Sequence, residues 1–309
     1  MYICFSLTSF VTLHSDFSRL RARLAFFRNL SYNDQILQVL TSILLFVKTI
    51  LIRKGRFSMN PALCSIIIPA SKAERTISLA LDSLIAQTCP DWRAYVIVDG
   101  PEGNDATLKI ANGYAARDPR FEVLCNRRNL GAADSRNRGA RAARTPWIAF
   151  LDSDDVFHPD KLERQLALAE QKDASFLCSA YNMISYPART LCKVSRVPPR
   201  IARGDLIKWN SIGCSTVMLR SELARKYPMD ARAIHEDYLC WLQCLQECDC
   251  FACQESLTDT LILPGSRNHS KLRAARGVWE IYRQHLGLSA LRSIEYMCGY
   301  AIRGFLKYI

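Results

Sequence analysis

The segment Trp147-Ile-Ala-Phe-Leu-Asp-Ser-Asp-Asp155 joins a short apolar run directly to a cluster of carboxylates. Its first five residues are all apolar and include β-branched and aromatic side chains, which is typical of a buried strand. Polar residues directly after such a strand are typical of an α/β protein, in which ligands bind beyond the carboxyl ends of parallel strands. The segment therefore indicates both a fold class and the place of a candidate site.

The residues before this segment alternate between strand-like and helix-like patterns. Short runs rich in β-branched or aromatic residues predict four strands, at 65–69, 94–99, 121–125 and 147–151. Apolar residues at helical spacing predict helices at 74–87, 105–116 and 132–144, and a further helix runs from Pro159 and Asp160 to Gln171. This order predicts an α/β fold with a mostly parallel central sheet flanked by helices.

Composition and charge limit the function classes. The chain has 309 residues, of which 49% are hydrophobic and 23% charged, so disordered and collagen-like classes are excluded. The net charge is +12, and residues 1–58 and 271–309 together carry +11 of it. A nearly neutral middle argues against a nucleic-acid-binding protein and favours termini that lie against anionic lipid.

Three regions are predicted along the chain. Residues 1–58 form a basic, partly apolar extension, whose run 36–52 is at the short limit for a bilayer span; the alternative is that translation begins at Met59. Residues 59–265 form the α/β domain. Residues 266–309 form amphipathic C-terminal helices, which suit either a membrane interface or packing on the domain.

The 13 cysteines do not indicate a disulfide-bonded secreted protein. Their number is odd and no secretory signal opens the chain, so a reduced, cytoplasmic protein is predicted. Cys250 and Cys253 have the spacing of a zinc knuckle, but no second separated pair accompanies them. Buried structural thiols are therefore favoured over a zinc site.

The carboxylates Asp152, Asp154 and Asp155 are the strongest chemical signal in the sequence. No GxGxxG follows the first predicted strand and no GxxxxGK[ST] occurs, so the dinucleotide-binding and P-loop classes are disfavoured. Three carboxylates in four positions repel one another unless a cation compensates, and their oxygens suit a hard divalent cation that also holds a diphosphate. The alternative is that they only favour the dipole of the following helix.

An ordered set of motifs resembles family 2 glycosyltransferases of the GT-A fold. The motifs are Ser65-Ile-Ile-Ile-Pro-Ala70, Ala73-Glu-Arg-Thr-Ile77, Ile97-Val-Asp-Gly100, Asn129-Leu-Gly131 with Ser135-Arg-Asn137, Phe150-Leu-Asp-Ser-Asp-Asp155 and His235-Glu-Asp-Tyr-Leu-Cys-Trp241. The last motif and the tail resemble bacterial transferases that build teichuronic acid, capsule, exopolysaccharide and O-antigen. The resemblance implies transfer of a sugar, with inversion, from a nucleotide-diphospho-sugar such as a UDP-sugar to a polysaccharide or lipid-linked acceptor. It also implies a cytoplasmic protein, peripheral on the inner face of the cell membrane.

The resemblance also implies roles for single residues. Asp237 matches the general base that takes the proton of the acceptor hydroxyl. Asp152 and Asp154 match the DxD pair that binds Mn²⁺ or Mg²⁺, with Asp154 as the direct ligand. Glu236 and Trp241 are expected to contact the acceptor, although Trp241 also suits a core position. The implied nucleotide-sugar site consists of Pro69, Glu74, Asp99, Arg136, Asp152 and Asp154.

Departures from the family pattern and two rival functions accompany this interpretation. Pro69-Ala-Ser-Lys72 stands where the family usually has Pro-x-Tyr-Asn, and Gly100 follows Asp99 in place of a second aspartate. One rival is a catalytically inactive nucleotide-sugar-binding or membrane scaffold protein. The other is a nucleotidyltransferase, which needs a glycine-rich first loop that Pro69–Lys72 does not provide.

Overall fold

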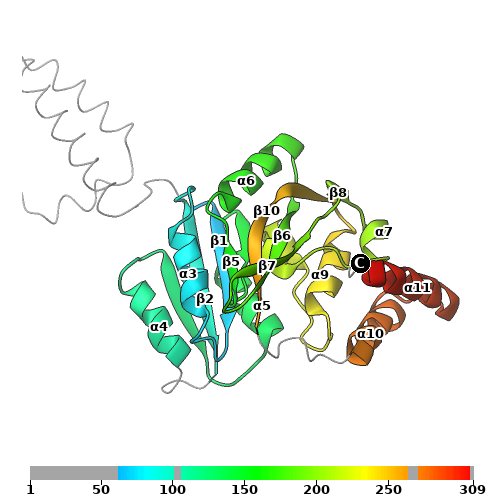
Figure 1. The fold of residues 1–309 in the computed structure, drawn as a ribbon, viewed down its shortest axis with the longest axis horizontal. Helices are drawn as coiled ribbons and strands as arrows, with labels where there is room; N and C mark the ends of the chain where they lie inside the picture. Colours follow the sequence, from blue (N-terminus) through cyan, green and yellow to red (C-terminus); the bar gives the residue numbers. More distant parts are fainter. Residues whose placement is uncertain (1–61, 101–105, 264–270, 307–309) are drawn as a thin grey trace, which may run out of the picture. The chain divides into compact units, whose positions relative to one another are not determined.

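The structure is a computed structural model that describes residues 62–100, 106–263 and 271–306, without the side chains of residue 271 and of residues 301–306 (Figure 1). The described residues all belong to one compact unit, Met59–Ile309. The predictions made for residues 1–58, including the apolar run 36–52, lie outside the described residues.

The first half of the sheet is parallel, as the sequence predicts. It has the order β3-β2-β1-β4. Its strands are β1 (Cys64–Ala70), β2 (Trp92–Asp99), β3 (Phe121–Asn126) and β4 (Trp147–Phe150). Every residue of β1 is buried, because helices cover both faces of the sheet there.

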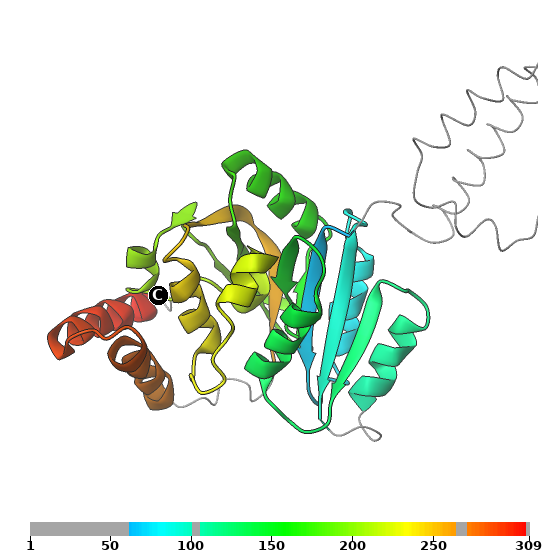
Figure 2. The same ribbon diagram turned by 180° about the vertical axis from the view of Figure 1, so that it is seen from behind.

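Two helical layers cover this sheet, and alternate side chains of the strands face each layer. Ile66 and Ile68 belong to the core under α3 (Ile77–Ile85), α4 (Ala106–Ala115) and α6 (Lys161–Lys172), which lie on the face shown in Figure 1. Ile67 belongs to the core under α5 (Ala132–Ala142), which lies on the opposite face of the sheet, shown in Figure 2. All four helices agree with the predictions to within a few residues.

The second half of the sheet is mixed, so the prediction of a mostly parallel sheet holds only for the first half. The order continues from β4 as β9-β6-β10-β5, and in this half only the pair β6 and β10 is parallel in the described residues. Its strands are β5 (Asp155–Phe157), β6 (Phe176–Ser185), β9 (Met218–Arg220) and β10 (Cys250–Ile262). Two edge strands, β7 (Thr190–Ser195) and β8 (Arg200–Ile201), pair with β6 and β10.

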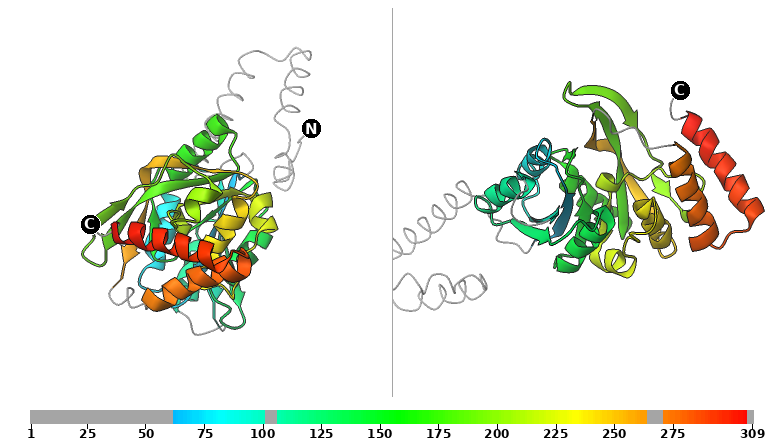
Figure 3. Two further views of the ribbon diagram at one scale, coloured as in Figure 1. Left: turned by 90° about the vertical axis from the view of Figure 1, so that its right-hand side faces the viewer. Right: turned by 90° about the horizontal axis from the view of Figure 1, so that it is seen from below.

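The remaining helices surround this second half. They are α7 (Arg203–Leu206), the 3₁₀ turn η3 (Cys214–Thr216), α8 (Ser221–Lys226) and α9 (Glu236–Cys244). The helices α10 (Lys271–Glu280), the π-helical turn η4 (Ile281–His285) and α11 (Ala290–Leu306) follow, and α10 and α11 lie at the edge remote from α4 (Figures 1 and 3).

The C-terminal helices are packed on the domain. Tyr282 is fully buried and lies in the same core as Tyr238 of α9, and the hydroxyls of both tyrosines donate to the carbonyl of Ile207. Part of α11 also contacts this core through Tyr296 and Tyr300. Among the described residues, no helix combines the length and the apolar character that crossing a membrane needs.

The cysteines of α9 and of the start of β10 are core residues. Cys240, Cys244 and Cys250 carry thiols that form no disulfide. They are buried between α9 and the sheet, where they act as small apolar side chains. The prediction of buried structural thiols is confirmed for these residues.

Candidate active site

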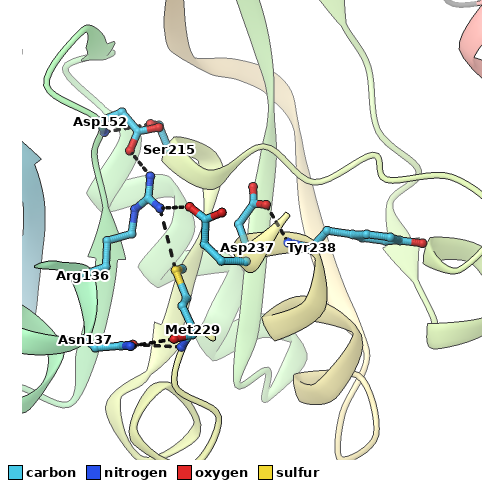
Figure 4. Close-up of polar contacts among 8 residues, drawn as sticks. Arg136, Asn137, Asp152, Ser215, Met229, Asp237 and Tyr238 are labelled. Carbon is cyan, nitrogen blue, oxygen red and sulfur yellow. Dashed lines mark hydrogen bonds and ion pairs between the residues drawn. The ribbon is translucent and has the colours of Figure 1, made fainter. Parts of the chain in front are cut away.

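The candidate site lies where the direction of the strand order reverses. From β1 the chain adds β2 and β3 on one side and then β4 on the other. In sheets of this kind ligands bind beyond the carboxyl ends of the strands at the point of reversal, here β1 and β4. Asp152 lies two residues after the end of β4, and Glu236 and Asp237 begin α9. The side chain of Arg136, from α5, lies between these two groups of carboxylates (Figure 4).

Arg136 is 6% exposed and binds a carboxylate on each side. Its Nη2 donates to Oδ1 of Asp152 at 2.6 Å, and its Nη1 donates to Oε1 of Glu236 at 3.0 Å. Burial lowers the pKa of the guanidinium, but Asp152 and Glu236 outweigh this effect and hold the pKa well above its ordinary value. A buried cation is costly unless it is paired, so this double pairing accounts for the arginine at this position.

The turn after β4 gathers the three predicted carboxylates in different environments. Asp152 and Asp154 are partly exposed, whereas Asp155 is 6% exposed and accepts a hydrogen bond from Thr260 at 3.4 Å. Burial and the Asp152 carboxylate raise the pKa of Asp154 above its ordinary value. Burial, followed by Asp152 and Asp154, raises the pKa of Asp155 much further. The repulsion expected from the sequence is therefore present, and it favours a bound cation.

Asp237 is partly exposed at the first turn of α9. Its Oδ1 accepts a hydrogen bond from the Tyr238 backbone N–H at 2.7 Å (Figure 4). Burial and the adjacent Glu236 carboxylate raise the pKa of Asp237, although Arg136 acts in the opposite direction. A carboxylate with a raised pKa accepts a proton more readily, as a general base must.

Glu236, which is expected to contact the acceptor, pairs with a residue of the protein itself. Its carboxylate points to Arg136, and its side chain is 23% exposed. One of its oxygens is therefore committed to an ion pair inside the protein.

Trp241 lies in the core, so the prediction that it stacks an acceptor sugar is wrong. Its side chain is fully buried and packs against Phe150 and Phe176, with ring centroids at 5.8 and 5.6 Å. Trp241 lies one turn beyond Asp237, on the side of α9 that faces the sheet. The core position that the sequence also allowed is the one observed.

Asp99 is 5% exposed and holds the loop that leads into α5. Its oxygens accept hydrogen bonds from Asn126 Nδ2 at 2.7 Å and from the backbone N–H groups of Leu130 at 2.9 Å and Gly131 at 2.7 Å. Three of its roughly four lone-pair positions are used within the protein. Asp99 thereby fixes the start of the helix that carries Arg136.

Pro69 and Glu74 lie at the carboxyl end of β1 and in the turn that follows it. Pro69 is buried within β1, where it pairs with Ile97 of β2. Glu74 is exposed in the turn between β1 and α3. Two of the predicted nucleotide-sugar residues, Arg136 and Asp152, are in direct contact.

Two residues that sequence reasoning did not assign also shape the site. Ser215 of η3 accepts a hydrogen bond from the Asp152 backbone N–H at 3.0 Å, which holds the carboxylate turn against η3. Asn137 exchanges two hydrogen bonds with the backbone of Met229, at 2.7 and 2.9 Å (Figure 4). Asn137 belongs to the family motif Ser135-Arg-Asn137. The sequence around Ser215 carries no comparable motif.

The donor set around Asp152 and Asp154 fits a divalent cation that is shared with a substrate. Mg²⁺ is commonly held by one or two carboxylates together with substrate phosphates and water. In the described part of the chain, no three histidine, cysteine or carboxylate side chains are arranged to hold a metal by themselves. A cation here would therefore take its other ligands from a diphosphate and water.

The topology and this site define a glycosyltransferase of the GT-A fold. The structure of TarS residues 1–349 from S. aureus, in complex with UDP-GlcNAc, has the same fold, with a TM-score of 0.61 and 18% sequence identity. The similarity covers 79% of this chain and 72% of that one. The sequence model described as "Glycosyl transferase family 2" matches residues 65–221, and the chain belongs to this family.

Two relatives from bacterial polysaccharide synthesis support the same conclusion. The chain is 30% identical to TuaG of Bacillus subtilis (strain 168), named as a teichuronic acid biosynthesis glycosyltransferase, over 72% of this chain and 88% of that protein. It is 29% identical to WfgD of Escherichia coli, over 81% of this chain and 96% of that protein. WfgD is named as a UDP-Glc:alpha-D-GlcNAc-diphosphoundecaprenol beta-1,3-glucosyltransferase.

Proposed function

We propose that this glycosyltransferase moves one sugar unit from a UDP-sugar to a lipid-linked oligosaccharide of a polysaccharide pathway, with inversion at C1. The observation that carries the proposal is that the buried Arg136 pairs with Asp152 on one side and, on the other, with Glu236, the residue directly before Asp237. In this arrangement, Asp152 and Asp154 are available to the cation of a donor diphosphate. Asp237 is available to the hydroxyl of an acceptor. The names of WfgD and TuaG support the choice of donor and acceptor class.

In this reaction, Asp237 removes the proton from the acceptor hydroxyl. The acceptor hydroxyl oxygen attacks C1 of the sugar, and a new C1–O bond forms while the bond from C1 to the nucleoside diphosphate breaks. The Asp237 carboxylate takes the proton of the hydroxyl, and the diphosphate leaves with the bonding electron pair. Attack from the face opposite the diphosphate inverts the configuration at C1.

Asp154 and Asp152 would hold Mn²⁺ or Mg²⁺ in this scheme. The bound cation would neutralise charge that develops on the departing diphosphate. Asp154 is the better direct ligand, because Oδ1 of Asp152 already accepts a hydrogen bond from Arg136. Both Nη groups of Arg136 already bind carboxylates of the protein. The role of Arg136 in this scheme is therefore to orient Asp152.

The enzyme is further proposed to act at the inner face of the cell membrane. One side of α11 packs on the core through Ser293, Tyr296 and Tyr300. The opposite side presents Leu291, which is 82% exposed, and Ile294, which is 51% exposed. The segment 271–309 carries seven basic and two acidic residues, so an anionic bilayer is the partner that its charge favours.

The direct test is transfer of radiolabelled sugar from UDP-sugars to undecaprenyl-diphosphate-linked acceptors, in the presence of Mn²⁺. Asp237→Asn should lower kcat by about 10²- to 10⁴-fold, because general-base catalysis is lost, while nucleotide binding is retained. Asp249→Asn is the matched control, since Asp249 pairs with Arg200 at the amino end of β10. Full turnover by Asp237→Asn would refute the assignment of the base, and nucleotide binding without transfer to any acceptor would favour the scaffold alternative.

A further inference from the structure

Arg136 connects two parts of the site that lie far apart in the sequence. Glu236 is 100 residues from Arg136, and Asp152 is 16 residues from it. The side chain of Arg136 is 7% exposed, and its Nε has no hydrogen-bond partner among the described residues. Its hydrogen bonding to charged groups is thus directed to Asp152 on one side and Glu236 on the other.

The first turn of α9 is held in place by side-chain contacts with other helices. His235 precedes the helix and makes no capping hydrogen bond with its side chain. An uncapped helix start must be held by other parts of the fold. Glu236, the first residue of the helix, is held by Arg136 of α5, and the ring of His235 lies 3.0 Å from the carbonyl of Ala274 in α10.

The chain before α9 is fixed on both sides as well. Asn137 of α5 binds the N–H and the carbonyl of Met229. On the other side, Gly277 of α10 approaches so closely that a Cβ atom there would lie 2.7 Å from Cβ of Ile234. Segment 229–236 is therefore held between α5 and α10, and Asp237 follows it directly.

We propose that Arg136 and Glu236 are positioning residues, whose ion pair orients the first turn of α9 so that Asp237 faces the acceptor. Glu236 is then part of the support of the base and not an acceptor ligand. Since the same guanidinium holds Asp152, the donor side and the base share one anchor. This inference rests on the proposed role of Asp237 as the general base.

The charge of Glu236 provides a readout that a purely structural role would not give. The charged and titratable groups around Asp237 are Glu236 and Cys240 of α9, Arg136 of α5, Asp152 after β4 and Cys214 of η3. Glu236 raises the pKa of Asp237, so removal of its charge should lower that pKa. The acid limb of the pH profile of kcat should then move to lower pH.

The test compares Glu236→Gln with Glu222→Gln in the full chain. Glu222 is an exposed residue of α8, so its variant should behave as the wild type. Glu236→Gln should lower kcat roughly 10- to 100-fold with unchanged KM for donor and acceptor, because the base is misplaced while both substrates still bind. Its acid limb should move to lower pH, whereas Glu236→Asp, which keeps the charge but is one methylene shorter, should lower kcat without that movement.

Three results would overturn the inference. They are a raised acceptor KM with unchanged kcat in Glu236→Gln, wild-type activity of that variant, or equal losses in Glu222→Gln. A loss of folding is detected separately, because thermal unfolding with and without UDP is measured for every variant. The proposed function fails in a different way, namely when Asp237→Asn retains full turnover.

Discussion

Gly139 of α5 lies directly against Ile67 of β1. A Cβ atom built on Gly139 would be 2.5 Å from Cγ2 of Ile67 and 2.8 Å from Cδ1 of Ile97. Real side chains essentially never approach so closely, so the helix could not lie at its observed distance from the sheet with any larger residue here. Arg136 lies one turn earlier on the same helix, and its reach to Asp152 and Glu236 depends on this close packing.

Gly139→Ala should therefore lower the free energy of unfolding by about 1–3 kcal/mol, the usual cost of overpacking a core. Gly113→Ala is the matched control, because Gly113 lies in helix α4 and a Cβ atom added there would meet nothing within 4 Å. That control should be neutral or stabilising by up to about 1 kcal/mol. Urea denaturation of residues 59–309 measures both values, and equal effects of the two substitutions would contradict this account of the packing.

The buried Lys161 should make stability depend on pH. Its Nζ donates to Gln165 Oε1 at 2.8 Å and to the Thr216 carbonyl at 3.1 Å, and burial lowers its pKa from 10.5 to about 7. Between these values the unfolded chain binds more protons than the folded chain. The free energy of unfolding should therefore rise with pH in this window, by up to about 1.4 kcal/mol per pH unit, and the cost of burying the cation is fully present below about pH 7.

Urea denaturation at pH 7, 8 and 9 checks this dependence. Lys161→Met should remove the rise, whereas the exposed Lys172→Met, at the other end of α6, should retain it. Identical pH dependence in the wild type and in Lys161→Met would show that Lys161 does not titrate in this range.

The three carboxylates after β4 should differ in their response to metal. A diphosphate bound with Mn²⁺ at about 100 times its Kd should raise the free energy of unfolding by about 2.7 kcal/mol. Asp154→Asn should lose this response to UDP and Mn²⁺, because it removes the carboxylate that we propose binds the metal. Asp155→Asn should keep it, since Asp155 is buried and hydrogen-bonded to Thr260.

Thermal unfolding with UDP alone, Mn²⁺ alone and both together measures this difference. Asp173→Asn, at the end of α6, controls for the loss of one negative charge. A response that survives in Asp154→Asn but disappears in Asp155→Asn would contradict this prediction, because it would show that Asp155 binds the metal.

The exposed side of α11 should bind anionic membranes. Leu291→Glu combined with Ile294→Glu should weaken binding to phosphatidylglycerol vesicles by at least about tenfold, because two apolar side chains no longer leave water. Leu191→Glu on β7 is the control, since Leu191 is also apolar and 55% exposed. Vesicle sedimentation is measured for the full chain and for residues 59–309, because residues 1–58 are also basic. Equal binding of all variants of residues 59–309 would exclude this surface.

The local elements of the first half of the domain were predictable from the sequence. Strand and helix periods are written in neighbouring residues, so β1 to β4 and the helices α3, α5 and α6 appear within a few residues of their predicted bounds. The motif at Asp152 and Asp154 was also predictable, because it follows a buried strand directly. The mixed second half was not, since β9 is only three residues long and its antiparallel place between β4 and β6 has no local signal.

The sequence by itself determined the α/β class, the family and the carboxylates that we propose carry the chemistry, because each of these depends on residues that are close together or on ordered motifs. Only the tertiary structure decided what the remaining polar and aromatic residues do. Trp241 and Asp237 share the first turns of one helix, yet Trp241 is fully buried in the core and Asp237 is partly exposed. Glu236 pairs with Arg136 across 100 residues. Such contacts follow from how the helices dock on the sheet, which no local periodicity specifies.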